Sequence, residues 1–260
     1  MKPISKYQGL VLKTKDYKES SSLVTIITKD FKQNYIVKGT KKINSKTSKW
    51  INFLNNISFN ATDTTSLNTL TEAYVINSYT NIILDQTKLE VAFVITEKLE
   101  LLFEQVTDTN KLYDFTLKIL ELLNNSSYPR QILQLFEIKI MYLLGIAPVL
   151  NVCMNCENDD ENIEFFLDVN LGGVICKKCL KYQDINNSKY ILSDELTKVF
   201  KYLYYIKIDN VDEEFLKLIY DIEQIKGENE LNKIIDLSYQ QYLDFYSKVK
   251  KVYLKIKGEK

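Results

Sequence analysis

The four cysteines of the chain fall into two closely spaced pairs, and this spacing limits how the surrounding residues can fold. Cys153 and Cys156 form one C-x2-C pair, Cys176 and Cys179 form the other, and residues 157–175 separate them. This spacing is typical of a tetrahedral zinc site with four thiolate ligands. Because four protein ligands leave no position for water or substrate, we expect one structural Zn²⁺ ion. Redox-active pairs and ordinary buried thiols are the alternatives.

The segment between the two pairs predicts a β-hairpin. Residues 165–175 (FFLDVNLGGVI) place Gly172 and Gly173 at a bend, so the second pair would return to the first. Lys177 and Lys178 would then offset the negative charge of four thiolates, and ordinary surface charge is the alternative explanation for them. We therefore expect a zinc-binding segment over residues 151–181.

The first 80 residues favour β-structure. Short stretches rich in β-branched and aromatic residues alternate with polar turns. The predicted strands span residues 7–14, 22–28, 34–38, 50–60 and 67–77, with a turn at 62–66. Five short strands suit a small barrel of the OB type, so we expect an OB-fold domain over residues 1–80.

From residue 87 onward the apolar residues recur at steps of three and four, which is the pattern of amphipathic helices. The predicted helices span residues 87–103, 110–123, 129–143, 193–205, 212–225 and 228–249. Pro129 suits a first helical position, Gly145 ends that helix, and Ser193 is a typical N-cap. We expect a helical domain over residues 81–260 that contains the zinc segment, which makes the fold class α+β.

The composition closes most familiar hydrolytic mechanisms. The chain has no His, which removes the Ser-His-Asp and Cys-His nucleophile pairs and the commonest general base near neutral pH. No pair of carboxylates stands out as an acid and a base. We therefore expect a protein that is not an enzyme. Neither a signal-peptide core nor an apolar run of about 18 residues occurs, so we also expect a cytoplasmic protein without a membrane partner.

A net charge of zero hides a strong asymmetry along the chain. Residues 1–60 hold 12 Lys and 3 acidic residues, so 12 − 3 gives +9, and the remainder carries −9. Clustered lysines raise the local potential and release counterions when they bind phosphates. The basic first segment therefore favours a polyanion as partner. The lysine-rich residues 248–260 either add to that surface or form a solvated helix end.

A basic loop follows the third predicted strand. Residues 36–49 contain five Lys and no acidic residue, and Gly39 allows the backbone to turn sharply. Such a loop suits the backbone of a nucleic acid, and an ordinary solvated loop is the alternative. The residues predicted to bind phosphates are Lys38, Lys41, Lys42 and Lys46.

Four aromatic residues lie near these lysines in the sequence. They are Phe31, Tyr35, Trp50 and Phe53. Aromatic rings on OB folds can stack with bases, which binds single strands without reading their sequence. Aromatic residues at alternate strand positions more often fill a small barrel, however, so we expect most of the four to belong to its core.

These segments together resemble the RecO family of bacterial recombination mediators over essentially the whole chain. The resemblance rests on YQGLVLKTKDYKESSSLVTIIT, on YIVKGTKK with the following Ser45, and on CMNC and GGVICKKC. Lys38, Gly39, Lys41 and Lys42 match the basic loop of the family. The family has an N-terminal OB fold, a helical C-terminal domain and an embedded zinc-binding segment.

The resemblance also implies a function. Proteins of this family bind single- and double-stranded DNA, anneal complementary strands, and act with RecR and single-strand DNA-binding protein to load RecA at the bacterial nucleoid. The resemblance thus implies that residues 1–80 are an OB-fold DNA-binding domain and that the phosphates bound by Lys38, Lys41, Lys42 and Lys46 are those of DNA. No G-x4-GK[ST] loop is present that could support nucleotide hydrolysis. The alternative is a zinc-ribbon accessory factor that binds RNA or the transcription machinery.

The chain departs from the family pattern at three places. Residues 29–33 lack the glycine that usually stands between these two strands, and Glu157 stands where a glycine often follows the second cysteine. Residues 239–254 resemble the last helix of the family without its frequent histidine. No partner-binding residue is therefore transferred to that helix.

Overall fold

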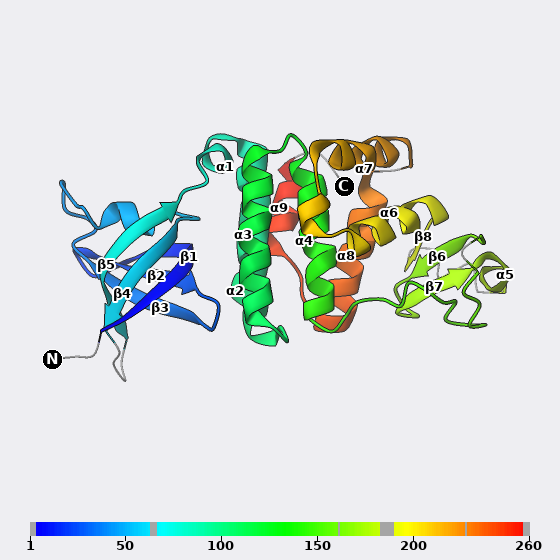
Figure 1. Cartoon of the computed structure of the whole chain (residues 1–260), viewed down its shortest axis with the longest axis horizontal. Coiled ribbons are helices and arrows are strands. Elements are labelled where there is room, and N and C mark those ends of the chain that lie inside the picture. Colours follow the sequence, from blue (N-terminus) through cyan, green and yellow to red (C-terminus); the bar gives the residue numbers. More distant parts are fainter. Residues whose placement is uncertain (1–3, 63–66, 161, 183–189, 227, 257–260) are drawn as a thin grey trace. The chain divides into compact units, whose positions relative to one another are not determined.

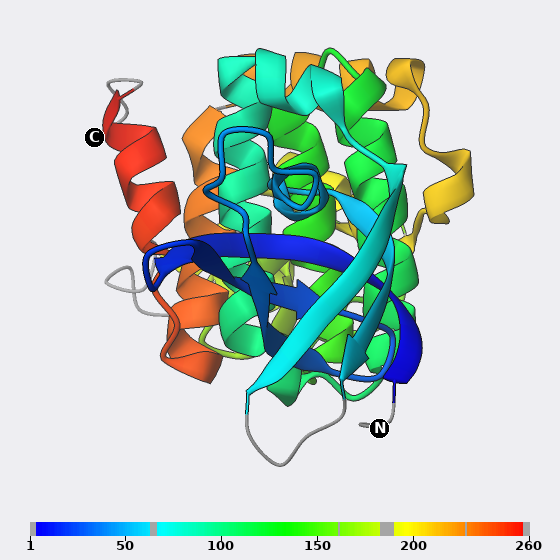
Figure 2. The same cartoon turned by 90° about the vertical axis from the view of Figure 1, so that its left-hand side faces the viewer.

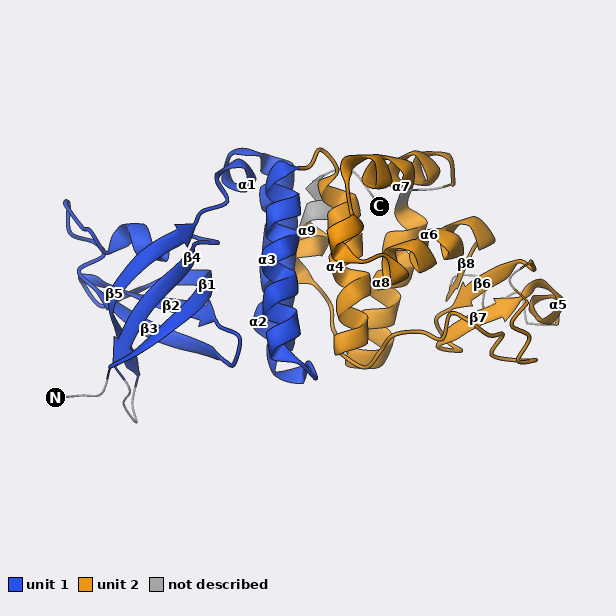
Figure 3. Cartoon of the chain, viewed as in Figure 1, with its two compact units in different colours: residues 1–125 blue, residues 126–260 orange. Residues whose placement is uncertain are grey.

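The computed structural model describes residues 4–62, 67–160, 162–182, 190–226 and 228–256. The chain forms two compact units, Met1–Asn125 and Ser126–Lys260 (Figure 3). The first contains a barrel and three α-helices, and the second contains five longer helices and a small three-stranded sheet. This arrangement confirms the predicted α+β class.

Unit 1 begins with a closed five-stranded barrel. Its strands are β1 (Ile4–Tyr17), β2 (Ser21–Ile27), β3 (Lys32–Lys38), β4 (Asn56–Thr62) and β5 (Asn68–Asn77). They close in the order β1-β2-β3-β5-β4, and every pairing is antiparallel except that of β3 with β5 (Figure 1). Figure 2 shows the long, curved β1 in dark blue. The barrel is OB-like, as the sequence predicts.

Alternate side chains of these strands fill the barrel. Val24 and Ile26 of β2 and Tyr35 and Val37 of β3 are among its buried residues. Close packing leaves no room for a side chain at Gly9, where a Cβ atom would lie 2.4 Å from Ile26 Cγ2 and 2.7 Å from the Ile27 carbonyl oxygen. The barrel therefore requires glycine at this position of β1.

One predicted strand begins later than expected. Ser48–Ile51 form a short 3₁₀ helix, and β4 begins only at Asn56. Between them Leu54 takes a left-handed backbone conformation with φ 65° and buries its side chain completely. Burial of Leu54 outweighs the strand propensity of the preceding residues, so the prediction for residues 50–55 is wrong. Of the predicted turn, residues 63–66 lie outside the described part.

Helices of unit 1 pack against its barrel. They are α1 (Thr80–Leu84), which was not predicted, α2 (Gln86–Leu102) and α3 (Thr109–Asn125). The Tyr113 hydroxyl donates to Asn56 Oδ1 at 3.3 Å, and the ring of Phe53 stacks on Phe93 with centroids 4.8 Å apart. The compact unit therefore continues past residue 80, where we place the end of the OB-fold domain itself.

Unit 2 is built on α4 (Pro129–Leu143), α6 (Asp194–Tyr205), α7 (Glu213–Lys226), α8 (Glu228–Leu243) and α9 (Lys248–Ile256). Pro129 occupies the first turn of α4, and the Ser193 side chain accepts a hydrogen bond from the Leu196 amide at the start of α6, as predicted. None of the described helices is both long enough and apolar enough to cross a membrane.

The last predicted helix is in fact two helices. Asp244 has φ 49° and ends α8, and α9 begins four residues later. The break lets Phe245 turn inward, where its ring lies 6.0 Å from that of Tyr239. The sequence does not reveal this break. Apolar residues on both sides of Asp244 keep the spacing of one continuous helix over residues 228–249.

Lys250 of α9 is buried in unit 2 rather than exposed. Its ammonium group lies 2.8 Å from Glu137 Oε2 of α4 and 2.8 Å from Asp236 Oδ1 of α8. Burial would lower the pKa of Lys250, but the two carboxylates hold it above its ordinary value. This lysine therefore has a structural role, and it does not belong to the phosphate-binding surface considered for residues 248–260.

Candidate metal centre and basic surface

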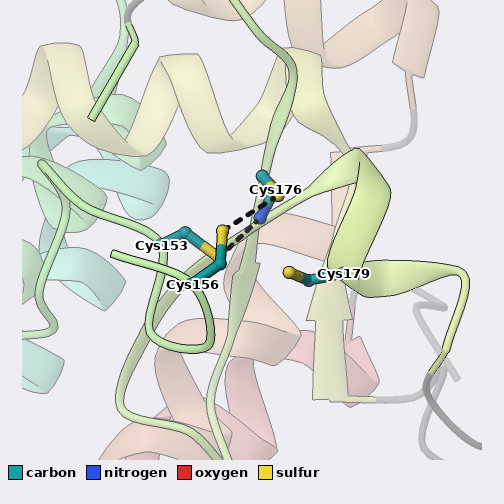
Figure 4. A group of neighbouring side chains, drawn as sticks. All are labelled: Cys153, Cys156, Cys176 and Cys179. Carbon is teal, nitrogen blue, oxygen red and sulfur yellow. Dashed lines mark hydrogen bonds between the residues drawn. The ribbon is translucent and has the colours of Figure 1, made fainter. Parts of the chain in front are cut away.

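The four cysteines meet in unit 2, as the sequence predicts. Their Sγ atoms all lie within 4.8 Å of one another, and those of Cys156 and Cys176 are 3.8 Å apart (Figure 4). A tetrahedral Zn²⁺ ion with Zn–S bonds of about 2.3 Å holds its sulfur atoms about 3.8 Å apart. All four thiols are free rather than paired in disulfides. The cluster therefore has the dimensions of a four-thiolate zinc site.

The first pair lies on a tight loop, residues 153–158, which we call the cysteine loop. The Glu157 amide donates to the Cys153 carbonyl at 2.9 Å, and the Met154 amide donates to the Val174 carbonyl at 2.8 Å. Glu157 has φ 56°, a conformation that normally favours glycine. The departure from the family pattern at residue 157 therefore preserves the turn at the cost of some backbone strain.

The second pair is placed by the predicted hairpin. β6 (Phe165–Asp168) pairs antiparallel with β7 (Gly173–Cys176), with Phe165 opposite Cys176. Cys179 follows in the short helix α5 (Lys177–Leu180). The Cys176 amide donates to Cys153 Sγ at 3.3 Å, which joins the two pairs directly.

The clustered thiols and the nearby amides shift the pKa values of the cysteines in opposite directions. Burial would raise the pKa of Cys153, but amides of Cys176, Asn155 and Cys156 lower it to about 6. At Cys179 the neighbouring thiol of Cys156, together with burial, raises the pKa to about 12. Four adjacent thiolates repel one another, and a central divalent cation removes this penalty. The donor set therefore fits Zn²⁺, for which thiolates are preferred ligands.

Lys177 makes a different contact from the one expected. Its ammonium group lies 2.6 Å from Glu164 Oε2, and both side chains are substantially exposed. This ion pair favours ordinary surface charge, the alternative explanation for Lys177, over direct compensation of the thiolates.

A second candidate site is the basic loop of unit 1, defined here as residues 38–49. Gly39 turns the chain with φ 74°, and the Thr47 hydroxyl donates to the Lys38 carbonyl at 3.1 Å. Ser45 Oγ lies 3.0 Å from Thr47 Oγ1 and accepts from the Ser48 amide at 3.1 Å. These polar contacts shape the loop, and the predicted Lys38, Lys41, Lys42 and Lys46 are all exposed on it.

Ion pairs divide the lysines of unit 1 into two groups. Lys13, Lys29 and Lys32 lie 3.0, 2.8 and 3.8 Å from carboxylates of Glu100, Asp114 and Glu104. In contrast, Lys38, Lys42 and Lys46 form no ion pair with any residue that the structure describes. Lys41 pairs at 3.1 Å with Asp16, whose side chain is 84% exposed. The basic loop therefore carries lysines that no described carboxylate compensates.

Sequence reasoning missed one lysine of this surface. Lys18, in the turn between β1 and β2, accepts a hydrogen bond at its carbonyl oxygen from Lys41 Nζ, and its own ammonium group lies 5.3 Å from the Tyr17 ring centroid. A Tyr-Lys pair in a turn between two predicted strands is the signal that could have identified it. Lys18 extends the basic surface beyond the loop.

The four aromatic residues mostly belong to the interior, as expected. Tyr35 is buried in the barrel, Trp50 packs against the same core, and Phe31 meets the Tyr7 ring edge-on at 5.3 Å. Phe53 stacks on Phe93 of α2. Each ring thus already has a protein neighbour, and none forms an open platform beside the lysines.

Comparisons with known proteins decide the family. The model of the "Recombination protein O N terminal" family matches residues 1–79, and that of the "Recombination protein O C terminal" family matches residues 84–250. The chain belongs to the RecO family. A DNA repair protein RecO of Bacillus subtilis (strain 168) is 28% identical over 249 residues, which cover 95% of this chain and 93% of that protein. The DNA repair protein RecO of Listeria monocytogenes serotype 4b (strain CLIP80459) is 26% identical over 254 residues with the same coverage.

Family membership agrees with the architecture of both units. The two RecO models meet between residues 79 and 84, where the barrel ends and the helices begin. The family is one of bacterial DNA repair and recombination proteins, which fits a chain that carries its uncompensated lysines on an OB-like barrel.

Proposed function

We propose that this RecO protein binds single- and double-stranded DNA, anneals complementary strands, and assists RecA loading together with RecR and single-strand DNA-binding protein. The cluster of uncompensated lysines at one end of the barrel carries the proposal. Lys38, Lys41, Lys42 and Lys46 bind phosphates, and Lys18 adds a fifth cation. The protein works in the bacterial cytoplasm, at the nucleoid, without covalent chemistry.

Charge neutralisation is the physical basis of annealing. Two complementary strands repel each other through their phosphates, and bound ammonium groups lower that repulsion while they release counterions. Because the lysines act as point charges on flexible stems, they tolerate either strand and any sequence. The basic loop thus brings strands together and leaves base pairing to the DNA.

We infer that Cys153, Cys156, Cys176 and Cys179 hold one Zn²⁺ ion. The ion would supply a cross-link between the cysteine loop and the β6–β7 hairpin, and four protein ligands leave it no position for substrate. Metal analysis of the purified protein tests this role, with one zinc per chain as the expected result. A metal-free sample that is fully folded would contradict it.

Annealing of complementary oligonucleotides, together with single-strand affinity across a salt series, tests the proposed function. A Lys38→Ala/Lys41→Ala/Lys42→Ala variant removes three phosphate contacts, so the slope of log affinity against log salt should fall by about 2. The matched control removes three exposed lysines of unit 2, Lys207, Lys217 and Lys233, and should retain the slope.

The same assay separates the proposal from its alternative. Wild-type protein that neither binds DNA nor anneals strands would contradict the RecO-type activity. If it instead bound structured RNA at least as tightly as single-stranded DNA, the RNA or transcription accessory role would replace it.

A further inference from the structure

Tyr17 is an aromatic residue of the barrel that does not belong to its core. It is the last residue of β1, and its side chain is partly exposed. Its hydroxyl has no hydrogen-bond partner, and its ring contacts no other aromatic ring, among the residues that the structure describes. The Lys18 ammonium group lies 5.3 Å from the ring centroid, within range of a cation–π attraction. Tyr17 is therefore a surface ring beside a cation.

The strand register places Tyr17 on the outer face of the barrel, in one row with Lys38. Tyr17 of β1 pairs with Ser21 of β2, and Ser21 pairs with Lys38 of β3. Directly opposed residues project from the same face, and neighbouring strands lie about 4.8 Å apart, so the two side chains start about 10 Å apart. The adjacent Val37 points the other way, into the core. Tyr17 thus shares a surface with the first lysine of the basic loop.

Lysines outnumber carboxylates around the ring. Lys15 lies two residues before Tyr17 on the same face of β1 and forms no ion pair with any described residue. Asp16 projects from the opposite face of the strand and pairs with Lys41 at 3.1 Å. Glu19 is the remaining acidic residue of this turn. The ring therefore lies among cations that can bind phosphates on both sides of a base.

An aromatic ring beside lysines suits an unpaired nucleotide. The ring stacks on the base, and the ammonium groups bind the phosphates that precede and follow it. Lys18 has a long, flexible stem, so its ammonium group can move to a phosphate when a base approaches the ring. In a duplex, the neighbouring base pairs cover both faces of each base. The ring can therefore bind a single strand but not the interior of a duplex.

We propose that Tyr17 stacks on one unpaired base of the single strand whose phosphates the basic loop binds, and that this contact makes the protein favour single strands over duplex. The inference rests on the proposed DNA binding and adds a contact with a base to a surface of phosphate contacts. Every base has a π-face, so the contact accepts any sequence. When annealing pairs the strands, the base leaves the ring, and phosphate contacts alone hold the duplex. Loss of the stacking contact thus promotes release of the annealed product.

Binding of three oligonucleotides to the intact protein tests the inference. They are a single strand of 15 nucleotides, the same phosphate chain with abasic sites throughout, and a closed dumbbell duplex, which has no open end for stacking. Tyr17→Ala should weaken the single strand about fivefold or more, the effect of losing one stacked base, and change the other two less than twofold. Its salt slope should stay unchanged, because no phosphate contact is lost. Tyr17→Phe should retain wild-type affinity, because stacking needs the ring and not the hydroxyl.

Tyr74→Ala is the matched control. This tyrosine is 65% exposed on β5 and donates to Glu72 Oε1 at 2.7 Å, so it offers a ring beside a carboxylate instead of a lysine. The variant should bind all three oligonucleotides as wild type does. An equal loss of single-strand affinity in Tyr74→Ala would show that the effect is not specific to the ring of Tyr17.

Other results would overturn the stacking contact, and they are distinguishable from failure of DNA binding itself. Unchanged single-strand affinity in Tyr17→Ala would show that the ring binds no base. An equal loss on all three oligonucleotides, or the same loss in Tyr17→Phe, would assign Tyr17 to phosphate binding or to the shape of the turn. Wild-type protein that binds none of the three would contradict the proposed function, on which the inference rests.

Discussion

The basic loop of unit 1 and the cysteine loop of unit 2 are both exposed, and each has only one buried side chain, Thr40 and Cys153 respectively. In the basic loop, neutral hydroxyls make the fixing contacts, and Thr40 Oγ1 lies 2.8 Å from Ser22 Oγ. In the cysteine loop, thiols make the corresponding contacts, and each thiol that ionises adds a negative charge. A loop held by neutral hydroxyls therefore needs no further ligand to be stable, whereas a loop held by thiolates needs a cation to offset their mutual repulsion.

Removal of zinc should have the largest effect and should separate the two loops. Structural zinc contributes about 10–16 kcal/mol in zinc-finger peptides, so either a strong chelator or Cys176→Ser should unfold the cysteine loop. Hydrogen exchange followed by mass spectrometry should show more than tenfold faster exchange at residues 153–158 and no change at residues 38–49. Equal exchange of the cysteine loop with and without metal would break the comparison.

A change deep in unit 2 tests whether the metal dependence belongs to the cysteine loop alone. Lys250→Ala leaves Glu137 buried without its cation, which should lower the free energy of unfolding by about 3–5 kcal/mol in urea. Zinc content should stay at one ion per chain. Lys251→Ala, at the exposed neighbouring position, is the control and should change stability by less than about 0.5 kcal/mol.

Backbone geometry gives a smaller effect in the basic loop. Gly39 has φ 74°, and an alanine there would incur about 1–2 kcal/mol of strain. Gly39→Ala should lower stability by that amount in urea unfolding, whereas Gly39→Asn should lose less, because Asn tolerates this conformation. Identical losses in both variants would mean that space, and not backbone conformation, selects glycine here.

Loss of one hydroxyl should have the smallest effect. Thr47→Val removes the bond to the Lys38 carbonyl and the contact with Ser45, which together contribute about 0.5–1.5 kcal/mol. Amide exchange in residues 38–49 should accelerate a few-fold, with zinc content unchanged. Complete unfolding of the basic loop would show that its structure depends on the Thr47 hydroxyl alone, which would contradict the comparison.

Local pattern was sufficient for most of the fold and for the cluster of four cysteines. Strand composition identified the barrel, the three- and four-residue period identified the long helices, and cysteine spacing identified the four thiols. The errors occur where a distant contact overrides local preference. Leu54 leaves the strand pattern to fill the barrel, and Asp244 breaks a helix so that Phe245 can be buried.

The basic surface shows the same limit more sharply. A lysine count assigns equal weight to Lys13, Lys29 and Lys38, yet the first two pair with carboxylates more than 80 residues away in sequence, 87 and 85 respectively. Neither composition nor residue spacing shows which lysines will pair with a carboxylate that is distant in sequence.

The burial of Lys250 has a consequence for how the protein is made. Glu137 meets its ammonium partner 113 residues later in the chain, so a ribosome that has just completed α4 carries a core carboxylate still waiting for neutralisation. Unit 1 lies within the first 125 residues and can begin to fold as it emerges. Glu137 cannot meet this cation until α9 has left the exit tunnel, so burial of the ion pair is a late step in the folding of unit 2.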